Sequence, residues 1–413
     1  MTAPSPGEAK PQRTAFRNPG FKNYWGARLA SAFAVQILSV SVGWHVYDLT
    51  HSAFDLGLVG LSQFLPALML VLVTGAAADR FSRRTIMGIC LATEALCATA
   101  LLAFLYTGLR QVWPIFLVLA CFGAARAFYN PAQQSIVPNL VPPEDLNNAI
   151  AWNSSSWQIA TILGPVVGGL LYGINAETSF ITALVLLLAS SVSALLIPKP
   201  QQKTVREKTT WTTLTSGFQY IWSEKIVLGA ISLDLFAVLL GGATALLPVY
   251  ARDILAVGPL GLGMLRAGSG IGAILVAAYL TKHPIRDHAG IIMFACVAGF
   301  GAFTILFGAS NVTWVSVLAL AVMGAFDMIS VYIRETLIQL WTPDAVRGRV
   351  SAVNQVFVGA SNELGEFRAG LSASAFGTVP AVVIGGIGTI VVAMLWAKLF
   401  PALREARHLR GRD

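Results

Sequence analysis

Charged residues are scarce in this sequence. They make up 12% of its 413 residues, whereas 55% of the residues are hydrophobic and the mean hydropathy is +0.68. A soluble domain carries about 25% charged residues, so this composition excludes a soluble globular protein. It indicates a chain that crosses a membrane several times.

The residue patterns of common catalytic and metal sites are also missing. The four cysteines have no CxxC or CxxH spacing and fall inside apolar runs, so we expect buried thiols without a disulfide or a metal. There is no GxxxxGK[ST] phosphate loop, no HExxH and no GxSxG motif. We therefore expect no ATP hydrolysis, no cofactor, no metal and no enzymatic activity.

Alternating ten-residue segments, which form membrane barrels, are absent as well. Apolar runs of about 20 residues, each long enough to span a bilayer as a helix, recur instead. The predicted fold class is an all-α membrane protein with twelve transmembrane helices. The expected spans are 22–48, 54–78, 85–107, 112–137, 149–173, 178–197, 226–249, 258–280, 288–309, 312–339, 350–375 and 378–400.

Basic residues are distributed unevenly between the two sides of these spans. Of the 28 Lys and Arg residues, 21 fall on the side of the two chain ends, and only Arg110 and Arg252 fall in loops on the other side. This bias predicts that both termini are cytoplasmic. The net charge of +8 is thus explained by topology and lipid contact, and no nucleic acid partner is expected.

The chain repeats itself at an offset of 201 residues. Gly57 aligns with Gly258, Gly123 with Gly324, and further glycines and leucines keep the same register. Two pseudosymmetric six-helix bundles are therefore expected, with a substrate site between them near the membrane midplane. The expected divisions are an N-terminal arm (1–21), a first bundle (22–197), a cytoplasmic linker (198–225), a second bundle (226–400) and a basic tail (401–413).

Residues 75–84 read "GAAADRFSRR" and lie between the second and third spans. This decapeptide resembles the loop motif of the major facilitator superfamily. The resemblance implies that the motif closes the cytoplasmic side, with Asp79 at the end of one helix facing the start of the eleventh near Arg349. The residues concerned are Gly75, which would permit close helix approach, and Asp79, Arg80, Arg83 and Arg84. The alternative is that the arginines only set topology.

Residues 163–169 read "LGPVVGG" and resemble a signature associated with antiporters in this superfamily. The residues that match are Gly164, Pro165, Gly168 and Gly169, and the alternative is tight packing of small residues. The segments 16–31 and 126–149 are similar to the drug:H+ antiporter branch that includes the bacterial enterobactin exporter and macrolide efflux pumps. The resemblance implies export of a small amphiphilic molecule.

Several ionisable residues are expected near mid-bilayer depth, where each costs about 2.5–3.5 kcal/mol on insertion scales. Glu363 and Glu366 lie one helical turn apart, and their repulsion favours one protonated carboxyl. The expected proton carriers are Glu363, Glu366, Asp327 and Asp234, in that order. The alternative for any one of them is a structural ion pair.

The resemblance implies that the first, fourth, seventh and tenth helices line a central cavity. The residues expected there are Arg126, Tyr129, Asn130, Gln133, His45, Gln36, Trp44 and Arg334. Arg126 and Asp327 are equivalent under the 201-residue shift, which suits a pair between the bundles or an amphiphilic ligand. His45 is either a proton relay with Asp48 or a hydrogen-bonded core histidine.

The sequence thus predicts a secondary transporter that exchanges a small amphiphile, such as a drug or a siderophore, for protons. The bilayer, the substrate and protons are the expected partners, and a monomer suffices to form the pathway. An importer or lipid-related transporter of the same fold is the alternative, followed by a receptor that does not transport.

Overall fold

The computed structural model describes residues 15–108, 110–198, 211–285 and 287–405. The chain begins with the short helix η1 (Ala15–Arg17) and then forms six long helices. They are α1 (Pro19–Thr50), α2 (Ala53–Arg80), α3 (Arg83–Thr107), α4 (Trp113–Ile136), α5 (Leu146–Ile174) and α6 (Ala176–Leu195). The short turns η2 (Val137–Asn139) and η3 (Pro143–Asp145) join α4 to α5.

The second half repeats this order. Its long helices are α8 (Lys225–Gly241), α10 (Gly258–Lys282), α11 (Ala289–Ala309), α12 (Thr313–Trp341), α13 (Asp344–Phe376) and α14 (Thr378–Leu399), followed by the short α15 (Pro401–Arg404). The described residues thus contain the twelve expected long helices. Most of the expected N-terminal arm, the first part of the linker and the end of the tail lie outside them.

The seventh span is broken. After Gly241 and Gly242 the chain continues through η4 (Thr244–Leu246), α9 (Leu247–Val249) and the π-helical turn η5 (Tyr250–Ile254). Two glycines in sequence and Pro248 explain why the regular helix ends here. We expected one continuous span over 226–249, and the structure corrects this. Broken membrane helices commonly lie at transport sites.

Eleven of the twelve spans are long and apolar enough to cross a membrane, by length and composition. The exception is α13, whose sequence includes Arg347, Arg349, Glu363, Glu366 and Arg368. A helix with this many charges is stable in a bilayer only where protein or water surrounds its polar face. It therefore belongs at the interior of the molecule, and α13 indeed packs against α2, α7 and α8.

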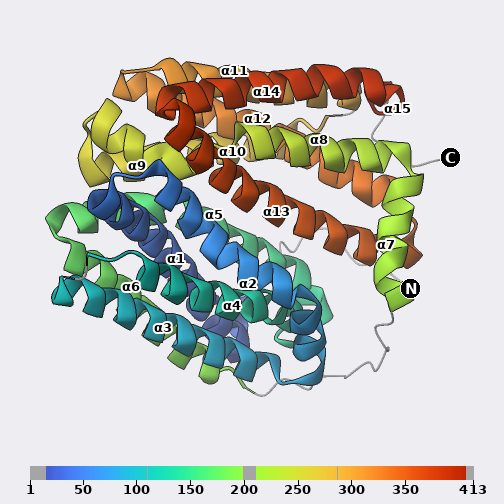
Figure 1. The fold of residues 1–413 in the computed structure, drawn as a ribbon. Coiled ribbons are helices and arrows are strands. Elements are labelled where there is room, and N and C mark those ends of the chain that lie inside the picture. The colour runs from blue at the N-terminus through green and yellow to red at the C-terminus, as the bar shows by residue number, and fades with distance from the viewer. Residues whose placement is uncertain (1–14, 109, 199–210, 286, 406–413) are drawn as a thin grey trace, which may run out of the picture.

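Each half has its own apolar core. In the first half the core runs between α1, α3, α4 and α6, and in the second half it joins α8, α11, α12 and α14. The most extensive contacts between the halves are those of α5 with α10 and of α2 with α13, and α1 also touches α9 and α10. Figure 1 shows the first half in blue and green below the second half in yellow and red.

The described linker contains an unexpected helix, α7 (Trp211–Ser223). It lies across the bundle at one end, which we call the linker end (Figure 1). The Tyr220 hydroxyl donates to the carbonyl of Trp341, and Gly217 packs against Arg349. The helix is thereby fixed to the end of α12 and the start of α13.

The two halves are in close contact at the opposite end, which we call the far end. A Cβ on Gly370 would lie 2.6 Å from the carbonyl oxygen of Ala53, and one on Gly169 would lie 2.4 Å from that of Pro259. Toward the linker end, a Cβ on Gly75 or Gly348 would meet nothing within 4 Å. Figure 1 shows α2 and α13 running apart from the far end toward the linker end.

Candidate transport cavity

A cavity of about 330 Å³ lies between the halves. Side chains from both halves line it, and most of them are apolar. The polar and charged ones are Gln36 and Ser39 on α1, Gln63 on α2, Thr244 at the break of the seventh span, Arg266 on α10, and Glu363 and Glu366 on α13. A mainly apolar cavity with a few convergent polar groups is the usual form of a small-molecule site.

The carboxylates of Glu363 and Glu366 meet at Gly60 of α2. A Cβ on Gly60 would lie 2.8 Å from Oε2 of Glu363 and 3.3 Å from Oε2 of Glu366. The absence of a side chain at this position is what lets two carboxylates from α13 reach the surface of the other half. Both carboxylates ionised in this space would repel each other, which favours the binding of a proton.

Arg266 brings a positive charge to the same cavity. Its Nη1 donates to Oγ of Ser39 on α1 at 2.5 Å, a bond that crosses between the halves. Its buried Nε has no hydrogen-bond partner among the residues that the structure describes. We did not predict Arg266 as a site residue, although an arginine within an apolar span is a signal that the sequence carries.

A neighbouring cavity of about 290 Å³ shares Arg266, Gln36 and Thr244 with the first one. Asp327 of α12 and Asn362 of α13 line it, with Phe300 and Met323 among the apolar residues. Arg266 thus lies between the glutamate pair on one side and Asp327 on the other. Of the predicted proton carriers, Glu363 and Glu366 thus line one cavity and Asp327 lines the other, and Arg266 lines both.

Asp234, the fourth predicted proton carrier, lies elsewhere. It forms an ion pair with Arg334 between α8 and α12, and the side chains are 9% and 3% exposed. Arg334, expected in the substrate cavity, is thus buried within the second half. Asp234 approaches Asp327 only across a small space of about 20 Å³.

The substitution Asp234→Asn should destabilise the protein by about 3–5 kcal/mol, because it leaves the buried charge of Arg334 without its counter-ion. Thermal unfolding in detergent measures this change. The double variant Asp234→Asn/Arg334→Leu removes both charges and should recover much of the loss. An unchanged midpoint for Asp234→Asn alone would show that the pair does not stabilise the fold.

The predicted stripe on α4 does not face the second half. Arg126 lies near Glu94 of α3, with 3.7 Å between Nη1 and Oε1, so of the two alternatives for Arg126 the pair with Asp327 is not the one that this structure contains. Tyr129 is buried under the guanidinium of Arg126. Gln133 donates to the hydroxyl of Tyr24 at 2.7 Å, whereas Asn130 is exposed. Burial within one half, which spacing alone cannot reveal, explains the difference.

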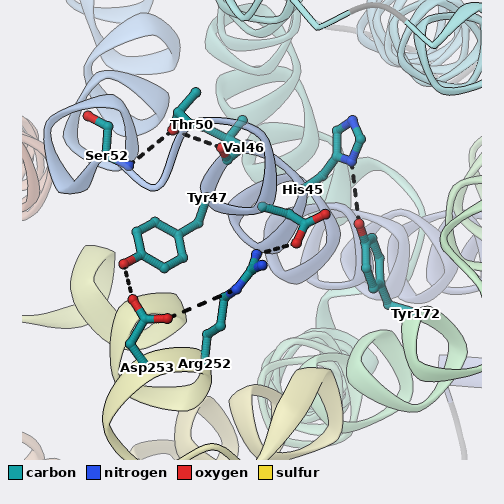
Figure 2. A network of polar contacts seen from close by, with 9 residues as sticks. His45, Val46, Tyr47, Thr50, Ser52, Tyr172, Arg252 and Asp253 are labelled. Carbon is teal, nitrogen blue, oxygen red and sulfur yellow. Dashed lines mark hydrogen bonds and ion pairs between the residues drawn. The ribbon is translucent and has the colours of Figure 1, made fainter.

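The end of α1 carries a polar network that connects the halves at the far end (Figure 2). Arg252 of η5 forms an ion pair with Asp48, and the Tyr47 hydroxyl donates to the carboxylate of Asp253. The Asp253 carboxylate also lies 4.0 Å from Nε of Arg252. These contacts hold the first and seventh spans together, and the sequence did not predict them.

Two other predicted residues of α1 lie beside this network. His45 contacts the hydroxyl of Tyr172 on α5, with 3.4 Å to Nδ1, and its ring meets Phe180 edge to face. Figure 2 shows His45 turned toward Tyr172, the contact expected of the second alternative, a hydrogen-bonded core histidine. Trp44 packs into the apolar cluster at the far end, and Gln36 alone of these residues lines the cavity.

The loop motif occupies the linker end. Arg83 donates to the carbonyl of Ser135 and to Oδ1 of Asn139, and Arg84 donates to the carbonyl of Ile197. Arg80 is exposed. These bonds join α3 to the ends of α4 and α6 within one half. The side chain of Asp79 lies outside the described residues, and the close approach expected at Gly75 is absent because the halves diverge here.

The glycines of the α5 motif lie in two tight contacts. A Cβ on Gly164 would lie 2.5 Å from Cβ of Gln36, and one on Gly168 would lie 3.0 Å from Cα of Ile37 on α1. Gly169 and the carbonyl of Pro165 meet α10 at Pro259 and Gly263. The motif therefore packs α5 between α1 of its own half and α10 of the other half.

The expectation of four buried thiols needs one correction. Cys90, Cys97 and Cys296 are buried and free, whereas Cys121 is free but exposed. The outer face of a membrane helix is apolar like the inner one, so an apolar run does not indicate which face a residue occupies. The described residues include no cluster of side chains suited to a metal ion.

Comparison with known proteins decides the family. The model of a family described as transmembrane secretion effectors matches residues 12–410. The chain belongs to this family of major facilitator superfamily transporters. It is 27% identical to the enterobactin exporter EntS of Escherichia coli K12 over 95% of this chain and 94% of the relative. The exporter of Citrobacter koseri is 26% identical with the same coverage.

Solved structures confirm the fold. A bacterial homologue of the human lysosomal transporter Spinster superposes with a TM-score of 0.73 at 13% identity, over 96% of this chain and 99% of that one. The nucleoside transporter NupG gives 0.70 at 16% identity, over 92% and 99%. The protein is therefore a multi-pass membrane transporter of this superfamily and not an enzyme.

Proposed function

We propose that this transporter exports a small amphiphilic molecule in exchange for protons. The observation that carries the proposal is the placement of Glu363, Glu366 and Arg266 around one cavity between the halves. A proton on the glutamates and a polar group of the substrate compete for this space. The similarity to enterobactin exporters supports the outward direction.

The proposed mechanism is alternating access. The basic residues at the linker end make it the cytoplasmic side, and the divergence of the halves there gives a state open to the cytoplasm. Substrate enters from that side and displaces a proton from the glutamates. The far-end network of Tyr47, Asp48, Arg252 and Asp253 then separates, and the cavity opens to the other side, where protons are available.

Asp327 has a supporting role in this proposal. It lies across Arg266 from the glutamates, so it is a second site at which a cationic or hydroxyl group of the substrate can bind. Phe300 and Met323 supply apolar surface beside it. All of these groups belong to one chain, so a monomer suffices for the proposed function. The proposed location is the bacterial inner membrane, as for the enterobactin exporters. The basic residues favour an orientation with both termini in the cytoplasm.

Inverted membrane vesicles test the proposal. A panel of fluorescent dyes, labelled macrolides and catechol chelators is offered to vesicles with an acidic interior. We expect accumulation of at least one compound, and loss of that accumulation when the pH gradient is collapsed. Accumulation that survives the collapse would refute proton coupling, and uptake only into right-side-out vesicles would instead identify an importer.

A further inference from the structure

Glu94 of α3 is a buried acid in the first half, outside the cavity between the halves. Its side chain is 0% exposed. Neither of its carboxylate oxygens accepts a hydrogen bond from the described residues. An ionised carboxylate in an apolar interior is strongly disfavoured without such bonds or a close counter-ion.

The nearest counter-ion stands slightly too far away. Nη1 of Arg126 lies 3.7 Å from Oε1 of Glu94, beyond hydrogen-bonding distance. The same Nη1 donates to Oγ of Ser31 at 3.3 Å, and the guanidinium lies 5.0 Å from the centre of the Tyr129 ring. Arg126 is thus shared between groups on three helices and is not committed to the acid.

The second half provides a comparison within the same molecule. There the buried carboxylate of Asp234 is in direct contact with Arg334, as expected for a pair in which both groups are charged. Glu94 and Arg126 are likewise a buried carboxyl group and a guanidinium, but they are 3.7 Å apart and not in direct contact. The difference indicates that the two acids are in different protonation states.

The other groups that surround Glu94 do not replace the missing counter-ion. The titratable groups near it are Cys90 and Cys97 on α3, and Tyr129 with Arg126 on α4. Farther away on α1, Arg28 donates to the carbonyl of Asn153 and to Ser156. Thiols and a phenol are neutral near pH 7, so Arg126 is the one nearby cation in the described residues.

We propose that Glu94 is a second proton-binding site of this transporter, located in the first half and separate from Glu363 and Glu366. In the present conformation the carboxyl is protonated and neutral. When Arg126 leaves Ser31 and moves into contact, the proton passes to water and an ion pair forms. Arg126 is 18% exposed, whereas Glu94 is fully buried, so the arginine is the less enclosed member of the pair.

Infrared spectroscopy of the purified, reconstituted protein tests this site without any substrate. A protonated carboxyl has a C=O stretching band that disappears when the group ionises. In the background Glu363→Gln/Glu366→Gln/Asp327→Asn, which also removes the acid of the neighbouring cavity, we expect a carboxyl band that titrates with pH and that is lost on adding Glu94→Gln. A band unchanged by Glu94→Gln would overturn the proposal, because Glu94 would then be ionised.

A second variant gives a readout that remains valid if Glu94→Gln misfolds. Arg126→Gln removes the cation that stabilises the ionised form, so the band of Glu94 should persist to higher pH than in the parent protein. If the band instead disappears at the same pH as in the parent protein, Arg126 does not govern release of the proton, and the proposed switch is overturned. This outcome is independent of transport, so it is distinguishable from failure of the proposed function.

Thermal unfolding gives a matched control. Glutamine resembles a protonated glutamate, so Glu94→Gln should leave the unfolding midpoint within about one degree of the parent protein. Asp234→Asn, at the closed pair, should lower it by several degrees. Equal losses in both variants would indicate that Glu94 is charged like Asp234 and would contradict the proposal.

Discussion

Replacing both Glu363 and Glu366 with glutamine is expected to abolish accumulation driven by a pH gradient. The two carboxylates meet at Gly60, so in the proposed cycle they share a proton that substrate displaces. Glutamine neither binds nor releases a proton in this range. We expect the initial rate of uptake into inverted vesicles to fall at least ~10-fold, equivalent to about 1.4 kcal/mol in the barrier.

The matched control is Glu144→Gln, which makes the same chemical change at an exposed residue of η3. It should leave the rate unchanged. Single replacements of Glu363 and Glu366 should rank the two residues, since either carboxyl can carry the proton when the other is absent. Wild-type accumulation by the double variant, with the gradient intact, would exclude these glutamates as proton carriers.

The second large effect is expected at the far end. The double variant Asp48→Asn/Asp253→Asn removes the ion pair to Arg252 and weakens the hydrogen bond from Tyr47. Exposed ion pairs contribute only about 0.2–1 kcal/mol, whereas hydrogen bonds to charged groups contribute about 1.5–3 kcal/mol. Their combined loss should shift the population toward the state open at the far end.

Spin labels at His51 and Asn311, exposed residues of the two halves at that end, measure the shift by pulsed electron resonance. We expect a second, longer distance to become populated in the double variant. Glu177→Gln, at the start of α6 on the same side, is the control and should not change the distribution. An identical distribution in the double variant would show that the network does not keep the far end closed.

Much of the fold could be predicted from the sequence because hydrophobic run length and loop charge act locally. The twelve helices follow from where apolar residues stop and charged ones begin. The break after Gly241 was missed because Ala243, Leu246 and Val249 continue the apolar run. Hydropathy measures burial in lipid or protein, and it does not register a change in backbone path.

The site could be predicted only in part. Glu363, Glu366 and Asp327 were found because a carboxyl inside an apolar span is rare. Asp234 and Arg334 give the same signal, yet they neutralise each other within one half. Helical spacing shows which side chains share a face, but it does not show which helix that face meets. For this reason Arg266, Ser39 and the far-end contacts emerged only from the structure.

Thiol accessibility tests the central claim most directly, namely that one cavity between the halves opens to each side in turn. In a protein with its four cysteines replaced, Ser39→Cys on α1 should react with a water-soluble maleimide from the cytoplasmic side. With Asp48→Asn/Asp253→Asn added, it should also react from the opposite side. A thiol at this position that is unreactive from both sides in both backgrounds would contradict the account.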